Sequence, residues 1–248
     1  MKIAFITAMP EEFRAVIRLL DTPATVRIGR YKTCSGIASG HDMVAIESGM
    51  GFDNAAEATE TLIREVHPEI IISAGFCGGI EPDLGVGDLV VATQLFVVSG
   101  DAVKEVPVDI ADAGHNFIVR QSMPAQRVFG GAFISTPVIM EKARIAAMLS
   151  TDVPHPVVEM ESAAIALIAT ENGIPFVGIR SVSDPADEEL SFSLDEFCDD
   201  QKRIRIPLVL LSIMRKPGII PQLLRLARNS RIAGASLAQA VEEFLAFV

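Results

Sequence analysis

Three acidic side chains stand where an apolar, strand-like run gives way to a turn or a helix. They are Glu12, Glu161 and Asp184, and a carboxyl group in such a place can donate or accept a proton. Open α/β sheets bind ligands beyond the carboxyl ends of their strands, which is where the run 176–180 would place Asp184. Acids near a helix N-terminus are also ordinary caps, and Asp-Pro is a common turn, so each carboxylate alone has a purely structural interpretation.

One of these acids belongs to a segment with two carboxylates. Residues 158–164 (VEMESAA) carry Glu159 and Glu161 on either side of Met160, where an apolar run ends and a helical one begins. A carboxylate that points into a cleft from this segment can accept hydrogen bonds from two vicinal hydroxyl groups, as a ribose requires. The segment is therefore a candidate for sugar binding.

A glycine-rich segment, residues 73–79 (SAGFCGG), follows the apolar run 70–72. Glycines at the end of a buried strand let backbone N–H groups approach a ligand more closely than residues with a Cβ would. The spacing matches neither a dinucleotide-binding fingerprint nor a phosphate-binding P-loop. Gly75 and Phe76 are therefore candidate site residues, although a tight structural turn explains the motif nearly as well.

Strand-like and helix-like segments that alternate along the chain must position these residues. The strand-like runs are 3–6, 43–46, 70–73, 89–92, 127–129, 157–158 and 176–180. Helical spacing of apolar residues appears at 11–20, 54–66 and 162–171. The alternation predicts βαβ units with right-handed crossovers. Since hydrophobic residues make up 50% of the chain but aromatic residues only 6%, the core is expected to be a buried, largely parallel sheet flanked by helices.

Length and charge limit the class of protein. At 248 residues the chain is long enough for one large α/β domain, with no linker or repeat to divide it. We expect a catalytic domain over 1–200 and a basic helical extension over 201–248 that packs on the same domain. The formal net charge of −11 argues against nucleic-acid binding, yet residues 201–241 hold eight basic residues and no acid.

The basic extension contains a helical segment with mixed character. Residues 222–228 (QLLRLAR) are expected to set Leu and Arg on different faces of a helix. A core-packed helix with a solvated basic edge is favoured over a helix that contacts a membrane surface. The apolar run 206–214 is too short to span a bilayer.

Cysteine and histidine usage predicts neither disulfides nor metal. Cys34, Cys77 and Cys198 are too few and too far apart for a disulfide framework or a common zinc spacing, so they are expected to be reduced thiols. The N-terminal segment does not have the pattern of a signal peptide, and a cytoplasmic location is expected. The four histidines show no ligand spacing, so no metal and no cofactor are expected.

Taken together, the segments 73–79, 158–164 and 180–187 (RSVSDPAD) resemble the purine nucleoside phosphorylase and nucleosidase superfamily. The chain is most similar to the methylthioadenosine/S-adenosylhomocysteine nucleosidase branch, from Met1 to about Phe197. The resemblance implies a nucleoside phosphorylase-like fold, a single α/β domain with a mixed central β-sheet flanked by helices. It also implies a homo-oligomeric enzyme that hydrolyses the N-glycosidic bond of a small-molecule purine nucleoside and releases adenine.

The same resemblance implies catalytic roles. Glu12 is expected to orient the attacking water, and Met160 and Glu161 are expected to hold the ribose. Asp184 would deliver a proton to purine N7, with Ser183 beside it. A purine anion is a poor leaving group and a ribosyl cation is unstable, so such a site needs an acid at the base and negative charge near the sugar. Asp184 must then be protonated in an apolar pocket that raises its pKa, whereas Glu12 must be ionised.

The resemblance implies further substrate contacts. Phe133 would stack on the base, and the backbone of Ile134 would read the edge of the base. The remaining residues expected to line the substrate site are Ala8, Gly75, Phe76 and Glu159.

Phosphorolysis is the nearest alternative to hydrolysis. Glu11 and Glu12 in the first loop would repel phosphate, which favours water as the nucleophile. Arg14 and Arg30 are conceivable phosphate ligands, however, so a purine nucleoside phosphorylase stays open.

Two further functions stay open as well. Phe76 stands where the related nucleosidases have a small residue near the nucleophile, and a bulky ring there would narrow the water site, as in an inactive nucleoside-binding module. The basic tail resembles the hopanoid-associated branch of the superfamily, which implies an adenosyl lipid as substrate. The short stretch 93–131 would leave the 5′ side of the pocket open for it.

Overall fold

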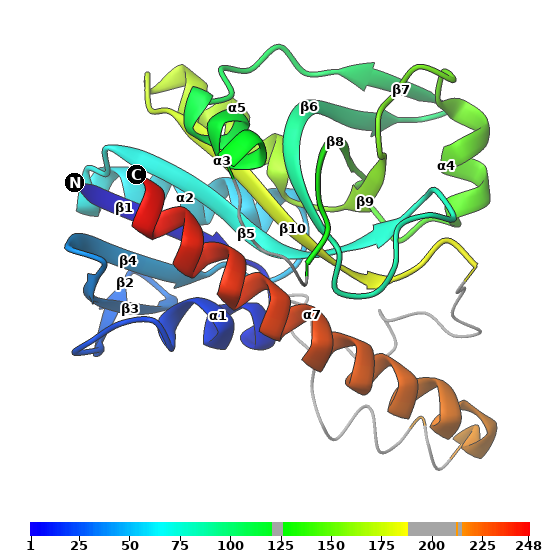
Figure 1. Cartoon of the computed structure of the whole chain (residues 1–248), viewed down its shortest axis with the longest axis horizontal. Helices are drawn as coiled ribbons and strands as arrows, with labels where there is room; N and C mark the ends of the chain where they lie inside the picture. Colours follow the sequence, from blue (N-terminus) through cyan, green and yellow to red (C-terminus); the bar gives the residue numbers. More distant parts are fainter. Residues whose placement is uncertain (121–125, 188–211, 213–214) are drawn as a thin grey trace.

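The computed structural model describes residues 1–120, 126–187, 212 and 215–248 (Figure 1). Cys198, the basic residues within 202–205 and most of the apolar run 206–214 lie outside the described residues. The elements in chain order are β1 (Lys2–Thr7), α1 (Pro10–Ile17), β2 (Ala24–Ile28), β3 (Tyr31–Ala38), β4 (His41–Glu47), α2 (Phe52–Val66), β5 (Ile70–Gly79), β6 (Leu89–Ser99), β7 (Ala102–Glu105), α3 (Asp112–Arg120), β8 (Val128–Ser135), α4 (Lys142–Met148), β9 (Val157–Glu159), α5 (Ser162–Glu171), β10 (Phe176–Asp184), a 3-10 turn (Pro217–Ile219) and α7 (Ile220–Phe247).

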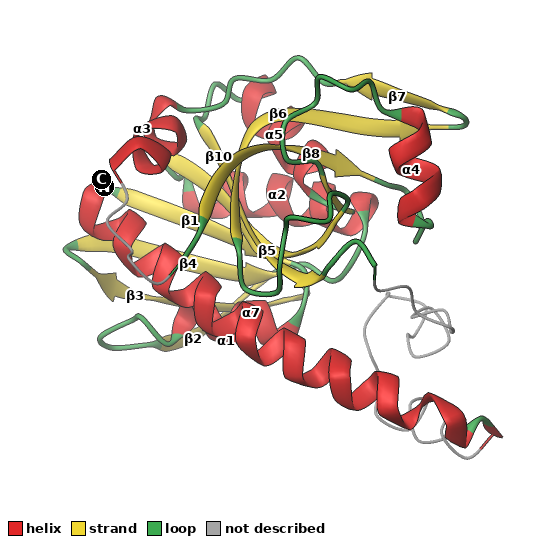
Figure 2. Ribbon diagram, turned by 45° about the vertical axis from the view of Figure 1, so that its right-hand side comes forward, coloured by secondary structure: helices red, strands yellow, loops and turns green. Residues whose placement is uncertain are grey.

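The described strands form one mixed sheet with helices on its two sides (Figure 2). Strand order along the sheet is β10-β6-β8-β9-β5-β1-β4-β3-β2, with β7 paired to β6. The expected single α/β domain with a mixed central sheet is thereby confirmed. The narrower expectation of a largely parallel sheet is wrong, because β2, β3 and β4 are antiparallel neighbours and β9 and β10 run antiparallel to β5 and β6 respectively.

Part of the sheet closes on itself. Strand β10 pairs with both β5 and β6, and β9 joins β8 back to β5, so five strands pair in a ring. Side chains on both faces of such a ring are covered. Residues 131–135 of β8 are accordingly buried without the alternation that a half-exposed strand shows.

The first helix directs an acid toward the sheet. Pro10 opens α1, where its missing N–H leaves no hydrogen bond unmade. Glu12 occupies the third helical position and its carboxylate accepts a hydrogen bond from the backbone N–H of Met9, the residue that caps the helix. This capping hydrogen bond fixes the Glu12 side chain at the end of β1.

The last helix divides into a packed half and an exposed half. Leu237, Val241 and Phe244 are fully buried where α7 crosses α1 and β10, whereas the N-terminal half extends past the rest of the described protein (Figure 1). Leu224 is 67% exposed on that half, next to exposed arginines. The predicted helix over 222–228 is therefore present in α7 but is not packed on the core there, because the described body covers only the second half of the helix. None of the described helices combines the length and apolar character that crossing a membrane would need.

Candidate active site

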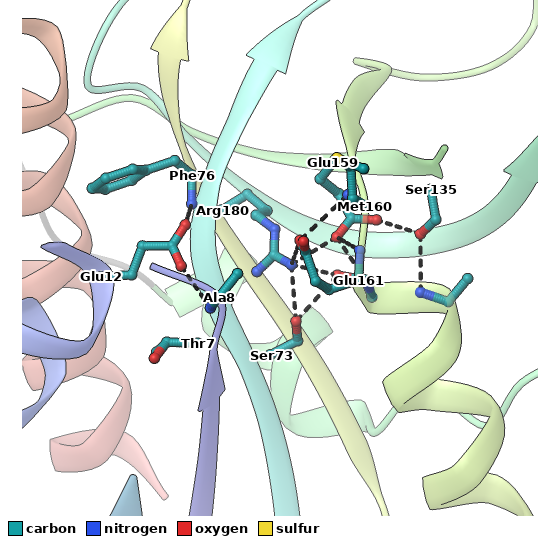
Figure 3. Close-up of polar contacts among 12 residues, drawn as sticks. Thr7, Ala8, Glu12, Ser73, Phe76, Ser135, Glu159, Met160, Glu161 and Arg180 are labelled. Atoms are coloured by element: carbon teal, nitrogen blue, oxygen red, sulfur yellow. Dashed lines mark hydrogen bonds and ion pairs between the residues drawn. The ribbon is translucent and has the colours of Figure 1, made fainter. Parts of the chain in front are cut away.

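The expected acids gather where strands β1, β5, β9 and β10 end or bend. Strand β5 runs parallel to both β1 and β10, and its residue Gly75 lies opposite Arg180 of β10. Figure 3 shows Glu12 of α1 brought close to Glu161, at the start of α5, and to Arg180 of β10. Asp184 ends the same β10 strand and lies opposite Gly78 of β5.

Glu12 is buried and held by backbone donors. One oxygen accepts hydrogen bonds from the N–H groups of Ala8 and Met9, both at 2.8 Å, and the other accepts one from Phe76, also at 2.8 Å. Burial raises the pKa of Glu12, against the opposing effects of the Arg180 charge and these three N–H groups. A carboxylate with a raised pKa is a better proton acceptor when it is ionised, which suits a general base.

Arg180 is the central cation of the site, and its role went unassigned at the sequence level. Its guanidinium is almost fully buried, and Nη2 donates to Glu159 at 2.7 Å, to Ser162 at 2.9 Å and to Ser73 at 3.0 Å. Atoms Nε and Nη1 are buried with no hydrogen-bond partner among the described residues. Since a buried guanidinium normally satisfies its donors, the site has donor capacity left for a bound group.

Glu159 is the structural partner of Arg180. Its carboxylate also accepts hydrogen bonds from the N–H groups of Glu161 and Ser162 at the start of α5, and from the Ser135 hydroxyl. Although burial raises the pKa of Glu159, the Arg180 charge and these hydrogen bonds outweigh it and leave the pKa lowered. With 1% of its side chain exposed, Glu159 supports the site from behind and does not line it, contrary to expectation.

Glu161 has the opposite electrostatic character. Its carboxyl group accepts a hydrogen bond from the N–H of Gly51 at 2.7 Å and lies 3.9 Å from Arg180. Burial, followed by the negative charge of Glu159, raises the pKa of Glu161 to about 8. Both causes favour the protonated form of Glu161, which can donate one hydrogen bond to a hydroxyl group.

Asp184 differs from expectation. Its Oδ1 atom accepts a hydrogen bond from the Ser183 hydroxyl at 2.8 Å, and its Oδ2 atom lies 2.7 Å from Nζ of Lys142. The side chain is 30% exposed, so its surroundings are neither apolar nor dry. Lys142 comes from α4, which the sequence did not predict.

Two glycines of the 73–79 segment make room for the acids. A Cβ at Gly75 would lie 2.8 Å from Glu12 Oε1 and 3.2 Å from Arg180 Nη1. A Cβ at Gly78 would lie 2.7 Å from Asp184 Oδ2. The glycines of this segment therefore let side chains approach the strand backbone closely. The sequence motif alone could not distinguish this role from that of a tight turn.

Phe76 does not obstruct the carboxylates. Figure 3 shows its ring directed away from Arg180 and Glu161, and a Cβ at Gly234 of α7 would lie 3.6 Å from the ring. The ring packs partly buried against the hydrophobic core. Phe76 contacts Glu12 through its backbone N–H, which donates a hydrogen bond to the carboxylate. The bulk of Phe76 was the main sequence argument for an inactive binding module, and that argument no longer holds.

Phe133 and Ile134 are not exposed to the site in this structure. Both are fully buried, and the Phe133 ring lies beneath the Arg180 guanidinium carbon at 5.7 Å. A ring without accessible surface presents no face to a base, because the closed ring of strands covers both sides of β8. Met160 is half-buried between Glu159 and Glu161 at the end of β9.

The arginines considered as phosphate ligands are engaged elsewhere. Arg14 pairs with Glu11 at 3.3 Å and Arg30 with Glu57 at 2.6 Å, all on the surface.

The described residues include one group that could hold a metal ion. Glu81, Asp83 and His155 have ligand atoms within 4.8 Å of one another. This group contains none of the residues that surround Arg180 or Asp184. His155 lies more than 70 positions after Glu81 and Asp83 in the chain, so inspection of histidine spacing did not find the group.

Comparison with known proteins finds one matching family and several similar proteins. Residues 2–215 match the Phosphorylase superfamily. The 5′-methylthioadenosine/S-adenosylhomocysteine nucleosidase of Bacillus cereus (strain B4264) is 32% identical over 221 residues, 80% of this chain and 92% of that protein. The nucleosidase of the same name from Neisseria meningitidis, solved in complex with methylthio-immucillin-A, is 26% identical with a TM-score of 0.72, over 100% of this chain and 99% of that one. The nucleosidase from Colwellia psychrerythraea 34H, solved with adenine, is 23% identical with a TM-score of 0.74, over 99% and 94% of the two chains, and shows the shared fold alone.

Proposed function

The chain belongs to the Phosphorylase superfamily, and from this premise we propose that it hydrolyses the N-glycosidic bond of 5′-methylthioadenosine and S-adenosylhomocysteine and releases adenine. The observation that carries the proposal is the buried pair of groups beside Gly75. Three backbone N–H groups hold the Glu12 carboxylate. A Cβ on Gly75 would lie 2.8 Å from Glu12 Oε1 and 3.2 Å from Arg180 Nη1, so both groups lie beside this residue of β5.

The attacking water is the occupant that this pair of groups would serve. Glu12 accepts the proton of a water molecule while Nη1 of Arg180 donates to its oxygen, so the oxygen keeps a free electron pair for C1′ of the ribose. As the O–C1′ bond forms, the N9–C1′ bond breaks and its electron pair moves into the purine. Asp184 transfers its proton to N7, which neutralises the leaving group.

Glu161 and Met160 are proposed to hold the ribose. Glu161 is buried next to the donor N–H of Gly51, and its two oxygens project from the start of α5. When it is ionised, it accepts hydrogen bonds from two vicinal hydroxyl groups and places negative charge near the developing ribosyl cation. Binding a diol therefore competes with protonation of Glu161.

Water is favoured over phosphate by the charge of the site. Glu12 lies next to the only guanidinium that the described part of the site contains, and the Glu159 carboxylate already neutralises that guanidinium. A phosphate dianion at this place would meet carboxylates without a matching set of cations. The surface pairs of Arg14 and Arg30 leave them poor candidates for that set.

The surroundings of the site support narrower proposals on partners. We propose a homo-oligomer, because Val138 and Ile139 are 56% and 43% exposed beside a cleft at the end of β8, where a second copy would cover them. The exposed basic half of α7 supports contact with an anionic membrane surface and hence a lipid-linked adenosyl substrate. Light scattering tests the first proposal, and co-sedimentation with anionic liposomes at low salt tests the second.

The experiment for the main proposal measures adenine released from methylthioadenosine, S-adenosylhomocysteine and adenosine, each with and without phosphate, by chromatography. Release that needs no phosphate is expected, with 5′-thio substrates preferred over adenosine. Release that requires phosphate would replace the hydrolase by a phosphorylase. Asp184→Asn is the matched variant, expected to remain folded and to lose activity.

A further inference from the structure

A lysine lies directly on the acid that we assign as proton donor. We propose that Lys142 is a positioning residue for Asp184: it fixes the carboxyl group and stabilises the carboxylate that remains after the proton has moved to the purine. This inference rests on the proposed function, because that function gives Asp184 the role of acid. It extends the site to α4, an element that no sequence motif pointed to.

Three polar contacts of Lys142 are directed at one short segment. Lys142 is the first residue of α4, only 7% exposed, and its Nζ atom lies 2.7 Å from Asp184 Oδ2. The same ammonium group donates to the backbone carbonyl of Asp184 at 3.0 Å and to that of Pro185 at 2.6 Å. A lysine this deeply buried requires such acceptors, and these three belong to Asp184, the last residue of β10, and to Pro185, which follows it. The ammonium thus ties α4 to the strand that carries the acid.

The space around the pair is closely defined by β5. A Cβ at Gly78 would lie 2.7 Å from Asp184 Oδ2 and 2.9 Å from Cε of Lys142, so glycine is needed for the two groups to meet. The neighbouring Cys77 is fully buried, and burial raises its thiol pKa well above the ordinary value. It therefore stays neutral near the pair. On the other side, the Ser183 hydroxyl donates to Oδ1 at 2.8 Å and leaves the carboxyl group oriented from both ends.

The more distant charges largely compensate each other. The charges of Arg180 and Glu159 shift the pKa of Cys77 in opposite directions. The two side chains form their own buried ion pair at 2.7 Å. Lys142, by contrast, is a charged side chain in direct contact with Asp184. An opposite charge at this distance favours the ionised carboxylate.

The chemical consequence concerns both the rate and the pH range. When Asp184 acts, its O–H bond breaks, an N7–H bond forms, and the electron pair of the O–H bond stays on the carboxylate. The ammonium stabilises this carboxylate, so it makes Asp184 a stronger acid toward the purine. The same stabilisation causes Asp184 to lose its proton at a lower pH in the free enzyme. Lys142 therefore increases the rate of proton transfer and narrows the pH range in which Asp184 can donate.

The kinetic test compares three variants of the full chain. Lys142→Met removes the charge with little change in volume, Lys142→Gln keeps a donor for the carbonyl groups, and Lys142→Arg keeps the charge. For the two neutral variants we expect kcat at the low-pH plateau to fall about tenfold. We also expect the basic limb of the kcat/KM profile to move up by about one pH unit or more. Lys142→Arg should keep the limb where the wild type has it.

A direct titration separates this inference from the proposed function. Carbon-13 labelling of the aspartate carboxyl groups allows Asp184 to be followed by NMR without any substrate, and its resonance is assigned by its loss in Asp184→Asn. The titration midpoint should rise by about one unit in Lys142→Gln relative to the wild type. An unchanged midpoint, or a basic limb that stays in place while the rate falls at every pH, would overturn the assignment and leave Lys142 with a purely structural role. A wild type that releases no adenine would refute the proposed function, and the NMR titration would still decide the role of Lys142.

Discussion

Replacing Gly75 by alanine tests the geometry of the water site with a single methyl group. The backbone of Gly75 has no positive φ, so alanine is compatible with its conformation. The new Cβ would lie 2.8 Å from Glu12 Oε1, 3.0 Å from Glu12 Cδ and 3.2 Å from Arg180 Nη1. Ordinary contact requires the carboxylate to retreat by roughly 0.6 Å.

That displacement acts on chemistry more than on folding. A shift of this size weakens the 2.8 Å hydrogen bond from Phe76 to Glu12 and moves the base away from the water. Misplacement of a reacting group by about 1 Å costs on the order of 10²-fold in rate, so we expect kcat/KM to fall by about 10- to 100-fold. The overpacking should cost about 1–2 kcal/mol of the free energy of unfolding.

The assay is adenine release at saturating and limiting substrate, together with thermal unfolding of the same preparations. Gly218→Ala is the matched control, because a Cβ there meets no atom of the described residues within 4 Å and should leave kcat/KM at the wild-type value. A Gly75→Ala enzyme with wild-type kcat/KM would show that the Glu12 carboxylate does not hold the nucleophile at this point.

Three further predictions concern the buried charges. Glu12→Gln should keep the fold and lose about 10³-fold in kcat, as measured by adenine release, because an amide cannot accept the water proton; activity within tenfold of the wild type would argue against a base at this position. Arg180→Met should lower the free energy of unfolding by about 3–5 kcal/mol in a urea titration, because it leaves the buried Glu159 carboxylate without its cation. The double variant that also carries Glu159→Gln should recover part of this loss. Burial and the charge of Glu159 raise the pKa of Glu161 to about 8, so between about pH 4.5 and 8 the folded chain keeps a proton that the unfolded chain loses. The free energy of unfolding therefore falls as pH rises through this window. In Glu161→Gln the dependence of Tm on pH should be weaker. An equal dependence in both proteins would contradict the assignment.

The sequence predicted those parts of the fold that have strong local patterns. Helix α5 was predicted at 162–171 and found at Ser162–Glu171, and buried strands such as β1 and β5 stand out as apolar runs. Strand β2 was missed because nearly all its side chains are exposed, so no alternation of apolar residues marks it. Helix α4 has only seven residues, and its buried lysine breaks the expected pattern.

The acids of the site were predicted better than their partners. Glu12, Glu161 and Asp184 follow strand-like runs and match a family motif, which can be recognised along the chain. Arg180 belongs to the same motif, but its role depends on meeting Glu159 and Glu12 in the folded protein. Lys142 lies 42 residues before Asp184, so only the three-dimensional structure reveals the pair.

The electrostatic assignment was less successful for the same reason. Asp184 was expected in an apolar pocket, but it is partly exposed next to a cation, whereas Glu12 is the more deeply buried of the two acids. Desolvation and ion pairing depend on the groups that tertiary contacts bring together, which local sequence does not encode.

Water as the nucleophile is the central claim, and one labelling measurement tests it most directly. A single turnover of methylthioadenosine in water enriched with oxygen-18, with phosphate present, is followed by mass spectrometry of the sugar product. Incorporation of one labelled oxygen at C1′ is expected, without any sugar 1-phosphate, and Glu12→Gln should form the same product about 10³-fold more slowly. Formation of the sugar 1-phosphate would contradict the account.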